Sequence, residues 1–380
     1  MKIQCEKSYL DSAVATASRA AAVKSPIPAL EGLLLQASKR IEPEMGLLTV
    51  TGYDLKKGIY AEAAVDLIES GSVVLPAKMF GEIVRKLPDG IVTISSDKNF
   101  KTHINCGKAD YDIMGSDPAD YPALPELDAG ARFDSLVMRQ TVMGAMIRQT
   151  AFAISDNESR PIYTGELLEC DGETVTMVAL DGYRLAVRRE KAASVSPEPI
   201  SVIIPGSALS DVEKLCTDEQ GSVCLVLGNK FLKFMLNNVT LITRKLEGEF
   251  LNYHKAVPAE FSISMKGERT ELIRCADRVS LMIDDRAKNP LRCQFGSGNL
   301  NITSATPLGR AEDNCRLEGD GKDTVIGLNN SYLLQALKAA PADTLLVKLN
   351  NGNSPIVFTP EEGDDSFVYM ILPVRLRTDA

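Results

Sequence analysis

The amino-acid sequence contains one pattern three times. The segment SVVLPAKMFGEIVRKL, which begins at Ser72, recurs as SVIIPGSALSDVEKL from Ser201 and as TVIGLNNSYLLQAL from Thr324. Each copy has a short apolar run, a turn residue, and then apolar residues at helical spacing, which predicts a strand followed by an amphipathic helix. A chain with this pattern has to build the same piece of structure three times.

A second repeated piece precedes each of these segments and sets the size of the repeat. It reads TVTGYDLKKGIY around Asp54, TMVALDGYRLAV around Asp181 and NITSATPLGRAE around Thr306, so the copies follow at intervals of 127 and 125 residues. Solenoid repeats have periods of roughly 20–50 residues, whereas a unit of this length is large enough for a core of its own. The sequence therefore predicts three tandem copies of one domain-sized module.

Within each module the predicted order is strand, helix, several strands, helix and further strands. Segments such as EGLLLQAS and TVTMVALD have the period of two that is expected of half-buried strands. Six helices combined with about two dozen short strands make an α+β protein. The helices are predicted over residues 8–24, 78–86, 136–150, 206–216, 268–279 and 331–340.

Two stretches rich in Pro, Asp, Gly and Ala separate the modules. They cover residues 115–131 and 247–260, and each contains a Pro after an apolar residue, at Leu124–Pro125 and at Val257–Pro258. The linkers themselves are therefore repeated. They place the modules at residues 1–127, 128–257 and 258–380.

The composition is that of an ordinary globular protein. Hydrophobic residues make up 44% of the chain and charged residues 24%, which is enough apolar material for three cores. No apolar run approaches the ~20 residues of a membrane span, and the start MKIQCEKSYL lacks the apolar region of a signal peptide. We expect a cytoplasmic protein that has no membrane partner.

The residues needed for catalysis or metal binding are scarce. The eight cysteines form no CxxC pair and mostly lie inside apolar patterns, which favours buried reduced thiols. With His103 and His254 as the only histidines, a Cys/His zinc site or a His-dependent nucleophile has few candidates. No P-loop, GxGxxG or HExxH motif is present. We expect no catalytic residues, no metal and no cofactor.

Positive charge gathers on the predicted helices, although the whole chain has a net charge of −9. Acidic proteins are normally poor partners for nucleic acids, because the phosphate backbone attracts clustered Lys and Arg. A basic helical face on an acidic body would reverse this locally. Solvated helix residues explain the same pattern, and the residues concerned are Lys78, Arg85, Lys86, Arg139 and Arg148.

Four segments in register with the repeat carry a resemblance to a known family. They are FAISDNESRPIYTGELLE from Phe152, VALDGYRLAVRR from Val178, LNNSYLLQAL from Leu328 and FVYMILPVRL from Phe367. They resemble the β subunit of bacterial DNA polymerase III, the β sliding clamp, over essentially the whole chain. The resemblance implies two protomers joined head to tail as a ring, with helices around a central hole and curved antiparallel sheets outside.

The resemblance also implies a function. Such a ring encircles double-stranded DNA without reading its sequence and tethers the replicative DNA polymerase, and it has no catalytic activity. Where the family often has a basic pair at the start of the second helix of module two, this chain has Gly206 and Ser207, so DNA contacts there are expected to be weaker. The predicted DNA-contacting residues are Lys24, Lys78, Arg85, Arg139, Arg148, Arg160 and Lys214.

A second implied site is a hydrophobic cleft between modules two and three. In the family it receives short linear peptides from the polymerase, the clamp loader and repair proteins. Tyr183 and Leu251 depart from the His and Pro that are frequent in the family, so the peptide preference is expected to be shifted. The predicted cleft residues are Tyr163, Leu180, Gly182, Tyr183, Arg184, Leu185, Leu251, Lys255, Ala256, Ser354, Leu372, Pro373, Val374 and Arg375.

The interface of the homodimer is predicted by position in the family. Tyr111 and Ile113 of module one match apolar positions that meet Met282 and Ile283 of module three in the other protomer. The alternation in YDI puts both side chains on one strand face, although an ordinary core strand gives the same pattern. Two other hypotheses remain, a thiol-dependent enzyme that uses a cysteine and a histidine, and a monomeric peptide-binding scaffold of the same fold.

Overall fold

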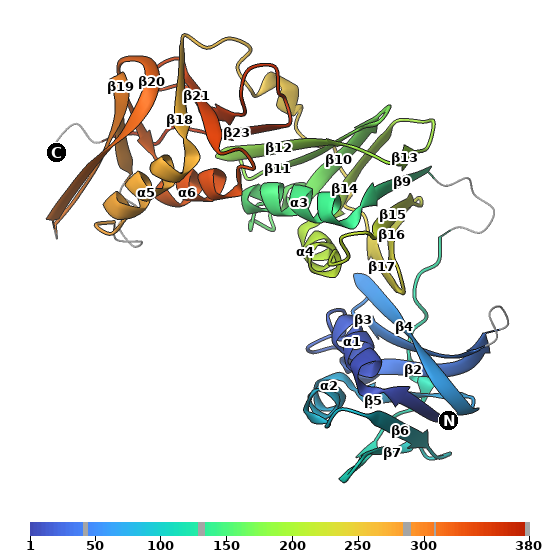
Figure 1. The fold of residues 1–380 in the computed structure, drawn as a ribbon. Helices are drawn as coiled ribbons and strands as arrows, with labels where there is room; N and C mark the ends of the chain where they lie inside the picture. The colour runs from blue at the N-terminus through green and yellow to red at the C-terminus, as the bar shows by residue number, and fades with distance from the viewer. Residues whose placement is uncertain (41–44, 128–133, 284–289, 308, 377–380) are drawn as a thin grey trace. The chain divides into compact units, whose positions relative to one another are not determined.

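The described part of the chain forms two compact units (Figure 1). The first unit contains module one and part of module two, and the second contains the rest of module two and module three. Residues 128–131 of the first predicted linker lie outside the described residues. The structure is a computed structural model that describes residues 1–40, 45–127, 134–283, 290–307 and 309–376.

An antiparallel sheet of thirteen strands is the framework of the first unit. Its main path runs β13-β9-β15-β16-β17-β4-β1-β6-β7-β8, while β2 pairs with β3 and β5, and β3 pairs with β4. Modules one and two share the sheet because β17 pairs along β4, from Val239 opposite Ala61 to Thr243 opposite Lys57. The strands are β1 (Lys2–Glu6), β2 (Gly32–Arg40), β3 (Met45–Tyr53), β4 (Lys57–Glu69), β5 (Gly71–Pro76), β6 (Ile91–Ser96), β7 (Lys101–Cys106), β8 (Ala109–Met114), β9 (Asp134–Arg139), β13 (Ser194–Val195), β15 (Ser222–Leu227), β16 (Phe231–Leu236) and β17 (Val239–Arg244).

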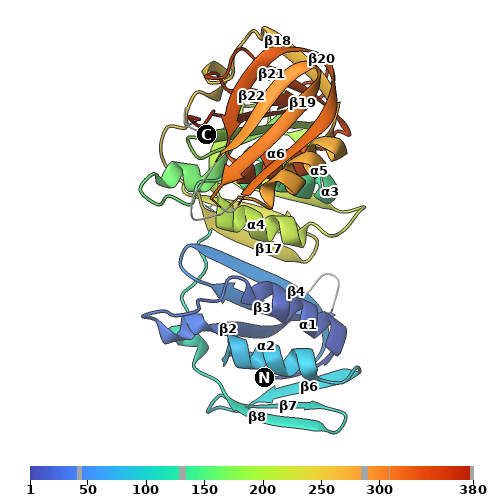
Figure 2. The same ribbon diagram turned by 90° about the vertical axis from the view of Figure 1, so that its left-hand side faces the viewer.

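Two helices of module one, α1 (Lys7–Ser18) and α2 (Ala77–Lys86), contact each other and cover one face of this sheet (Figure 2). Their buried residues recur at helical spacing, Leu10 and Val14 on α1 and Phe80 and Val84 on α2. This stripe is buried against strands β1 to β5, so the amphipathic pattern of the sequence decides which helix face packs on the sheet.

The second unit is built on an antiparallel sheet of ten strands. Their order is β14-β10-β11-β12-β23-β22-β21-β18-β20-β19. Modules two and three share this sheet because β12 pairs along β23, from Arg184 opposite Ile371 to Arg188 opposite Phe367. The strands are β10 (Gly165–Asp171), β11 (Thr174–Leu180), β12 (Arg184–Lys191), β14 (Ile200–Pro205), β18 (Ile263–Glu268), β19 (Leu291–Thr306), β20 (Gly309–Leu328), β21 (Thr344–Leu349), β22 (Ile356–Thr359) and β23 (Phe367–Ile371).

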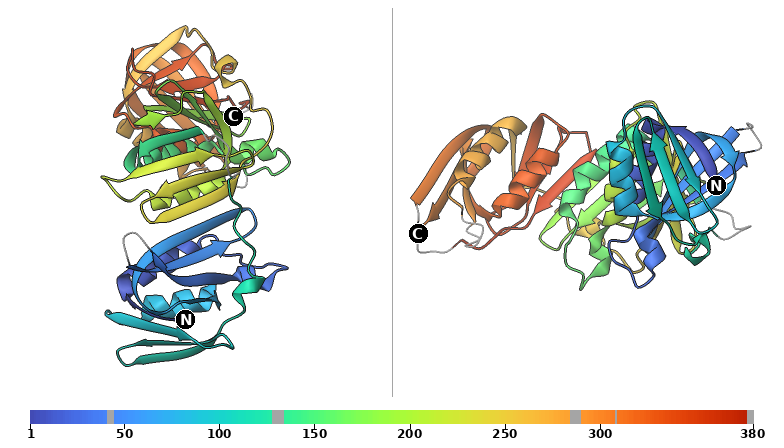
Figure 3. Two further views of the ribbon diagram at one scale, coloured as in Figure 1. Left: turned by 90° about the vertical axis from the view of Figure 1, so that its right-hand side faces the viewer. Right: turned by 90° about the horizontal axis from the view of Figure 1, so that it is seen from below.

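Helices α5 (Arg269–Ser280) and α6 (Asn330–Ala339) lie side by side on one face of the second sheet (Figure 3). The side chain of Asn329 accepts a hydrogen bond from the backbone N–H of Tyr332 at 3.1 Å, which caps the first turn of α6. The remaining helices, α3 (Gln140–Thr150) and α4 (Gly206–Leu215), belong to module two. None of the helices in the described residues is long and apolar enough to span a membrane.

The repeat read from the sequence recurs at the level of single hydrogen bonds. In the β3–β4 turn, the Asp54 carboxylate accepts hydrogen bonds from the N–H groups of Lys56 (2.9 Å) and Lys57 (2.7 Å). In the β11–β12 turn, Asp181 does the same for the N–H groups two and three residues ahead, at 2.8 and 3.0 Å. Modules one and two therefore share one turn geometry.

Six α-helices are present in the described residues, as predicted, but two of their boundaries were predicted wrongly. Residues 136–139 belong to β9 because they pair with β15, which an apolar run alone does not distinguish from a helix start. The first helix ends at Ser18, because the N–H groups of Ala20 and Ala21 bond three residues back and the N–H of Ala22 donates to the carbonyl of Leu30 instead.

Candidate functional site

An apolar cluster lies on one face of the sheet where β10, β11 and β12 meet β22 and β23. We call it the outer cluster. Leu180 and Leu185 of the predicted cleft belong to it, while Tyr163 and Ala256 pack against its edge. Its buried members are Leu167, Val178, Leu180, Leu185, Val187, Ile203, Tyr253, Val357 and Met370.

The β11–β12 turn holds one rim of the outer cluster. Gly182 has a φ of +92°, a left-handed conformation that favours glycine at this position. The next residue, Tyr183, is 64% exposed, so its ring stands free at the rim. The turn therefore presents a large amphipathic side chain beside a buried apolar floor.

The C-terminal segment forms a second rim. The N–H of Leu372 donates to the carbonyl of Tyr183 at 2.8 Å, and the N–H of Val374 donates to the carbonyl of Gly327 at 2.8 Å. These bonds hold the segment against the β11–β12 turn, while the side chains of Leu372 and Val374 remain exposed at 36% and 37%. Pro373 between them is half-buried, and Arg375 after them is exposed.

The linker between modules two and three supplies the remaining wall. The ring of Tyr163 meets the ring of Phe250 edge to face, with centroids 5.6 Å apart. Tyr253 of the same linker is buried, and its hydroxyl donates to Glu169 at 2.9 Å. Leu251 and Lys255 are exposed at the surface of the same linker.

Two predicted cleft residues use their side chains in other ways. Arg184 lies on the face of β12 opposite to Leu185, where its guanidinium carbon is 4.2 Å from the ring centroid of Tyr332 and its Nε donates to Asp181 at 2.8 Å. The Ser354 hydroxyl closes its own turn by donating to the carbonyl of Asn351 at 2.8 Å. Neither residue belongs to the outer cluster, and their part in the cleft stays a prediction.

The basic residues predicted to contact DNA all have exposed side chains. Lys24 lies in the loop after α1, and Lys78 and Arg85 lie on the first and last turns of α2. Arg139 is the last residue of β9 and not a helical residue, which corrects the prediction. Arg148 lies in the last turn of α3, Arg160 precedes the short 3-10 helix Pro161–Thr164, and Lys214 lies in the last turn of α4.

Helices α5 and α6 differ in charge from those of module one. Three of their four basic residues form ion pairs, Arg269 with Asp343 at 3.4 Å, Lys338 with Asp277 at 3.3 Å, and Arg278 with Asp313. Their charge is thus largely compensated by acidic neighbours. The sequence count of helical charges could not reveal this, because Asp313 and Asp343 lie on other elements.

The predicted dimer residues of module one lie on β8, at the end of the first sheet. Tyr111 is 38% exposed, but Ile113 is only 8% exposed and belongs to the core of module one. The side chain of Ile113 therefore packs mainly inside its own module. In module three, Met282 is 38% exposed, and Ile283 packs against the core of that module.

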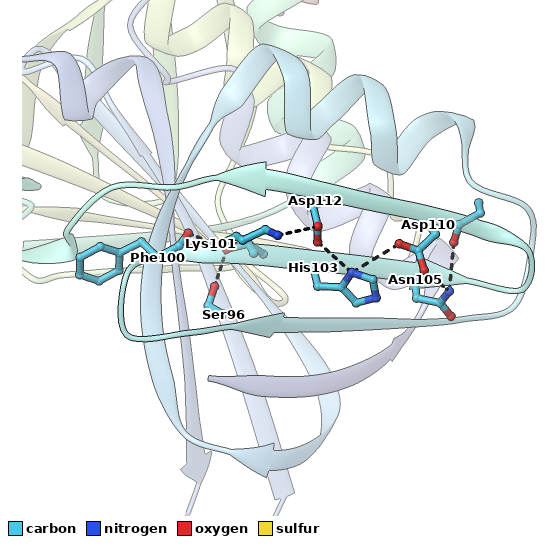
Figure 4. A network of polar contacts seen from close by, with 9 residues as sticks. Ser96, Phe100, Lys101, His103, Asn105, Asp110 and Asp112 are labelled. Carbon is cyan, nitrogen blue, oxygen red and sulfur yellow. Dashed lines mark hydrogen bonds and ion pairs between the residues drawn. The ribbon is translucent and has the colours of Figure 1, made fainter.

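A network of charged and polar side chains lies along the β7–β8 hairpin, which also carries Tyr111 (Figure 4). The Nδ1 atom of His103 lies 3.0 Å from Asp112 and 3.4 Å from Asp110, and Lys101 Nζ lies 2.8 Å from Asp112. The hydrogen bonds from Lys101 and then His103 lower the pKa of Asp112. Asp112 thus keeps its negative charge beside the predicted interface.

Family models match the chain in three successive segments. The N-terminal, central and C-terminal domains of the DNA polymerase III beta subunit match residues 1–125, 137–252 and 254–375. The chain belongs to this family.

Relatives of the clamp family match at full length. The beta sliding clamp of Synechocystis sp. is 32% identical over 99% of this chain and 100% of its own length. A putative DNA polymerase III beta subunit from Eubacterium rectale has a TM-score of 0.91 at 30% identity, covering 98% of this chain and 99% of that structure. The DNA polymerase sliding clamp from Bacillus subtilis has a TM-score of 0.91 at 27% identity, covering 99% of this chain and 100% of that structure. Three tandem clamp domains, as predicted, are thereby confirmed.

Several residues of the outer cluster were not predicted from the sequence. Phe250, Tyr253, Val357 and Met370 complete its floor and wall, but an isolated apolar residue in a strand looks like any core residue. For Tyr253 a signal existed, since the other linker carries Tyr121 in the matching place and that ring is also buried. Repetition within the chain could therefore have identified it.

Two of the buried cysteines of this clamp-family chain, Cys5 and Cys293, are poor nucleophiles. Burial raises the pKa of Cys5 to about 11 and that of Cys293 to about 12, so both stay protonated at neutral pH. The ring of His254 stacks on Tyr253, and that of His103 faces two carboxylates. No group of His, Cys, Asp and Glu in the described residues is arranged to hold a metal ion.

Proposed function

We propose that two copies of this chain join head to tail into a ring that encloses double-stranded DNA and tethers the replicative DNA polymerase. The observation that supports the peptide-binding part is the outer cluster, together with the exposed apolar side chains Tyr183 and Leu372, whose backbones are hydrogen-bonded at the end of the β12–β23 ladder. An apolar floor with an amphipathic rim suits one or two anchor residues of an otherwise flexible peptide. Partners of this kind are the polymerase, the clamp loader and repair proteins.

DNA contact is proposed to be electrostatic and independent of sequence. The exposed Lys24, Lys78, Arg85, Arg139, Arg160 and Lys214 make no ion pair with any other described residue, so their charges are available to phosphates. A modest charge surplus fits a protein that slides, since strong phosphate contacts would raise its affinity for each position on DNA. The closed ring would keep the protein on DNA even though its phosphate contacts are weak.

In this proposal the chain acts as a processivity factor and catalyses no reaction. A thiol-dependent enzyme that uses Cys5 or Cys293 is disfavoured, because burial raises the pKa of both thiols. A monomeric scaffold is disfavoured by the exposed apolar residues Tyr111 and Met282 at the predicted joint. The division at residues 127 and 257 is kept as part of this proposal.

The decisive experiment is retention on DNA of different topology. The chain, loaded on a nicked circle, should remain bound through gel filtration and should leave when the circle is cut, because a ring slides off a free end. Equal retention on circular and linear DNA would contradict enclosure. Native mass spectrometry of the same preparation should give about twice the 41.2 kDa of one chain.

A further inference from the structure

A surface groove lies at the joint between modules one and two. We call it the linker groove. It has a volume of about 840 Å³ and lies between β2, β3, β4, β16 and β17 on one side and residues 121–127 of the first linker on the other. Its lining includes Thr51, Lys233, Met235 and Ile242.

The linker groove occupies the place in the repeat that the outer cluster occupies between modules two and three. Ile242 pairs with Gly58 across β17 and β4, just as Met370 pairs with Leu185 across β23 and β12. The two strand joints therefore present equivalent faces. Each is covered by a linker with a buried tyrosine, Tyr121 in one case and Tyr253 in the other.

The linker itself fills the deepest part of the groove. A Cβ atom on Gly58 would lie 2.2 Å from Leu124 Cδ2, so the leucine of the linker occupies the space that Leu185 fills in the other joint. The outer part remains open, since Met235 is 43% exposed there and Ile242 lies on the floor. A ligand would therefore find room for an apolar side chain against Met235, but no deep pocket.

A lysine side chain, Lys233, distinguishes this groove from the outer cluster. Lys233 pairs with Ile242, and the residue in the same position of the other joint, paired with Met370, is Val357. Lys233 is half-buried and forms no ion pair with any described residue. The acidic residue along the described lining is Glu126, which is exposed on the linker. The groove thus offers a partly desolvated positive charge next to apolar surface, which complements a carboxylate.

We propose that the linker groove is a second docking site, for an extended peptide segment that carries a carboxylate next to an apolar side chain. The proposal rests on the proposed function, because it extends peptide binding from one strand joint to its repeat. Thr51 and Lys233 stand where the outer cluster has Val178 and Val357, so the second site favours a more polar peptide than the first.

The test is a titration of the full chain, labelled with ¹³C at methionine and isoleucine methyl groups, with acetyl-Asp-Leu-Phe-amide. The methyl of Met235 reports on the linker groove and that of Met370 on the outer cluster, so the two sites are read separately. We expect saturable shifts at Met235 and Ile242. The neutral probe acetyl-Asn-Leu-Phe-amide should bind the groove several-fold more weakly, because it cannot pair with Lys233.

Charge variants make the test specific. Lys233→Glu should weaken binding at Met235 about tenfold while the shifts at Met370 stay unchanged, because an attractive contact becomes repulsive. Lys233→Gln should abolish the preference for the aspartate probe. The matched control is Lys230→Glu, the same charge change on the exposed loop before β16, outside the groove, and it should have no effect.

Each outcome decides between the two sites. Shifts at Met370 with none at Met235 or Ile242 would overturn the second site and leave the proposed cleft standing. Equal effects of Lys233→Glu and Lys230→Glu would also overturn it, because the charge would then act at long range. If the probe changes the chemical shift of neither the Met235 nor the Met370 methyl, both the second site and the proposed peptide class would be overturned.

Discussion

Glu166 is a carboxyl group held where water does not reach. It lies on β10 with no exposed surface, and the Thr150 hydroxyl donates to its Oε2 at 2.5 Å. Its other oxygen, Oε1, has no hydrogen-bond partner in the described residues. Burial raises the pKa of Glu166 from 4.5 to about 8. The folded chain therefore prefers this carboxyl group protonated.

This preference predicts a pH-dependent stability. Because the folded pKa lies above the unfolded one, the free energy of unfolding is unaffected below pH 4.5 and falls as the pH rises towards 8, by at most about 1.4 kcal/mol per pH unit. Glu166→Gln should remove this fall and leave the variant more stable than the wild type at pH 8.5. Urea unfolding at pH 5, 7 and 8.5 measures it, with exposed Glu173→Gln as the control. Parallel pH profiles for Glu166→Gln and the wild type would refute the assignment.

Single residues also show which features of the site could not be predicted from the sequence. The alternation of β12 puts Arg184 and Leu185 on opposite faces of the sheet, and only Leu185 belongs to the outer cluster. A part for Arg184 in the cleft stays a prediction. For Tyr111 and Ile113 the alternation was interpreted correctly, but their burial is set by neighbouring strands. Ile113 lies opposite Thr102 of β7, which is itself fully buried. Such contacts depend on tertiary pairing, which no local pattern contains.

At the scale of elements, substitutions on β8 should distinguish an effect on dimerisation from an effect on folding. Tyr111→Glu should give folded monomers, because a charge placed in an apolar contact between copies costs several kcal/mol while the core of module one is intact. Ile113→Glu should instead unfold module one, since this side chain is buried. Sedimentation velocity and thermal unfolding distinguish the two. The control is Met114→Glu on the same strand, 62% exposed, which should remain dimeric. A Tyr111→Glu variant that stays dimeric would place the interface elsewhere.

Under the proposed function, we expect the C-terminal segment to decide peptide affinity. Truncation of Leu372, Pro373 and Val374 to Ala should weaken binding of a peptide with a Gln and a Leu-Phe end by roughly 1–3 kcal/mol for each lost anchor. Dimerisation should survive, because none of these three residues is among the predicted interface residues. Fluorescence anisotropy measures the affinity, and Met79→Ala, an exposed residue of α2, is the control. Unchanged affinity would exclude these residues as anchors.

Elements were predicted better than their ends. The helices were found because their apolar residues recur at helical spacing and face one sheet. The stretch Leu136–Arg139 was misassigned because three apolar residues in a row suit either a strand or a helix, and only its ladder with β15 decides. The outer cluster was predicted in part, from the turn and the C-terminal segment, while its floor depended on strands brought together by the fold.

At the scale of the whole molecule, basic charge should govern contact with DNA and not stability. Changing Lys24, Lys78 and Arg85 to Ala should lower the slope of log affinity against log salt by about one unit for each lost phosphate contact, equally for all sequences. The melting temperature should hardly change, since these side chains are exposed. A matched triple variant of paired cations, Lys266, Arg310 and Lys338 to Ala, should leave the slope unaltered. A lower melting temperature with an unaltered slope would instead mean that the first set has a structural role.

The two strand joints within the chain have a mechanical consequence. Modules one and two are connected by a backbone ladder between β4 and β17, reinforced by an ion pair between Lys57 and Asp211, and modules two and three by a ladder between β12 and β23. Separating the strands at either joint requires breaking a row of backbone hydrogen bonds at once. Both joints therefore resist separation. In the proposed ring of two copies, the weakest seams would therefore be the two between copies, which the prediction places beside β8. A partner that opens the ring would have to apply its force to one of those seams and could leave every module intact.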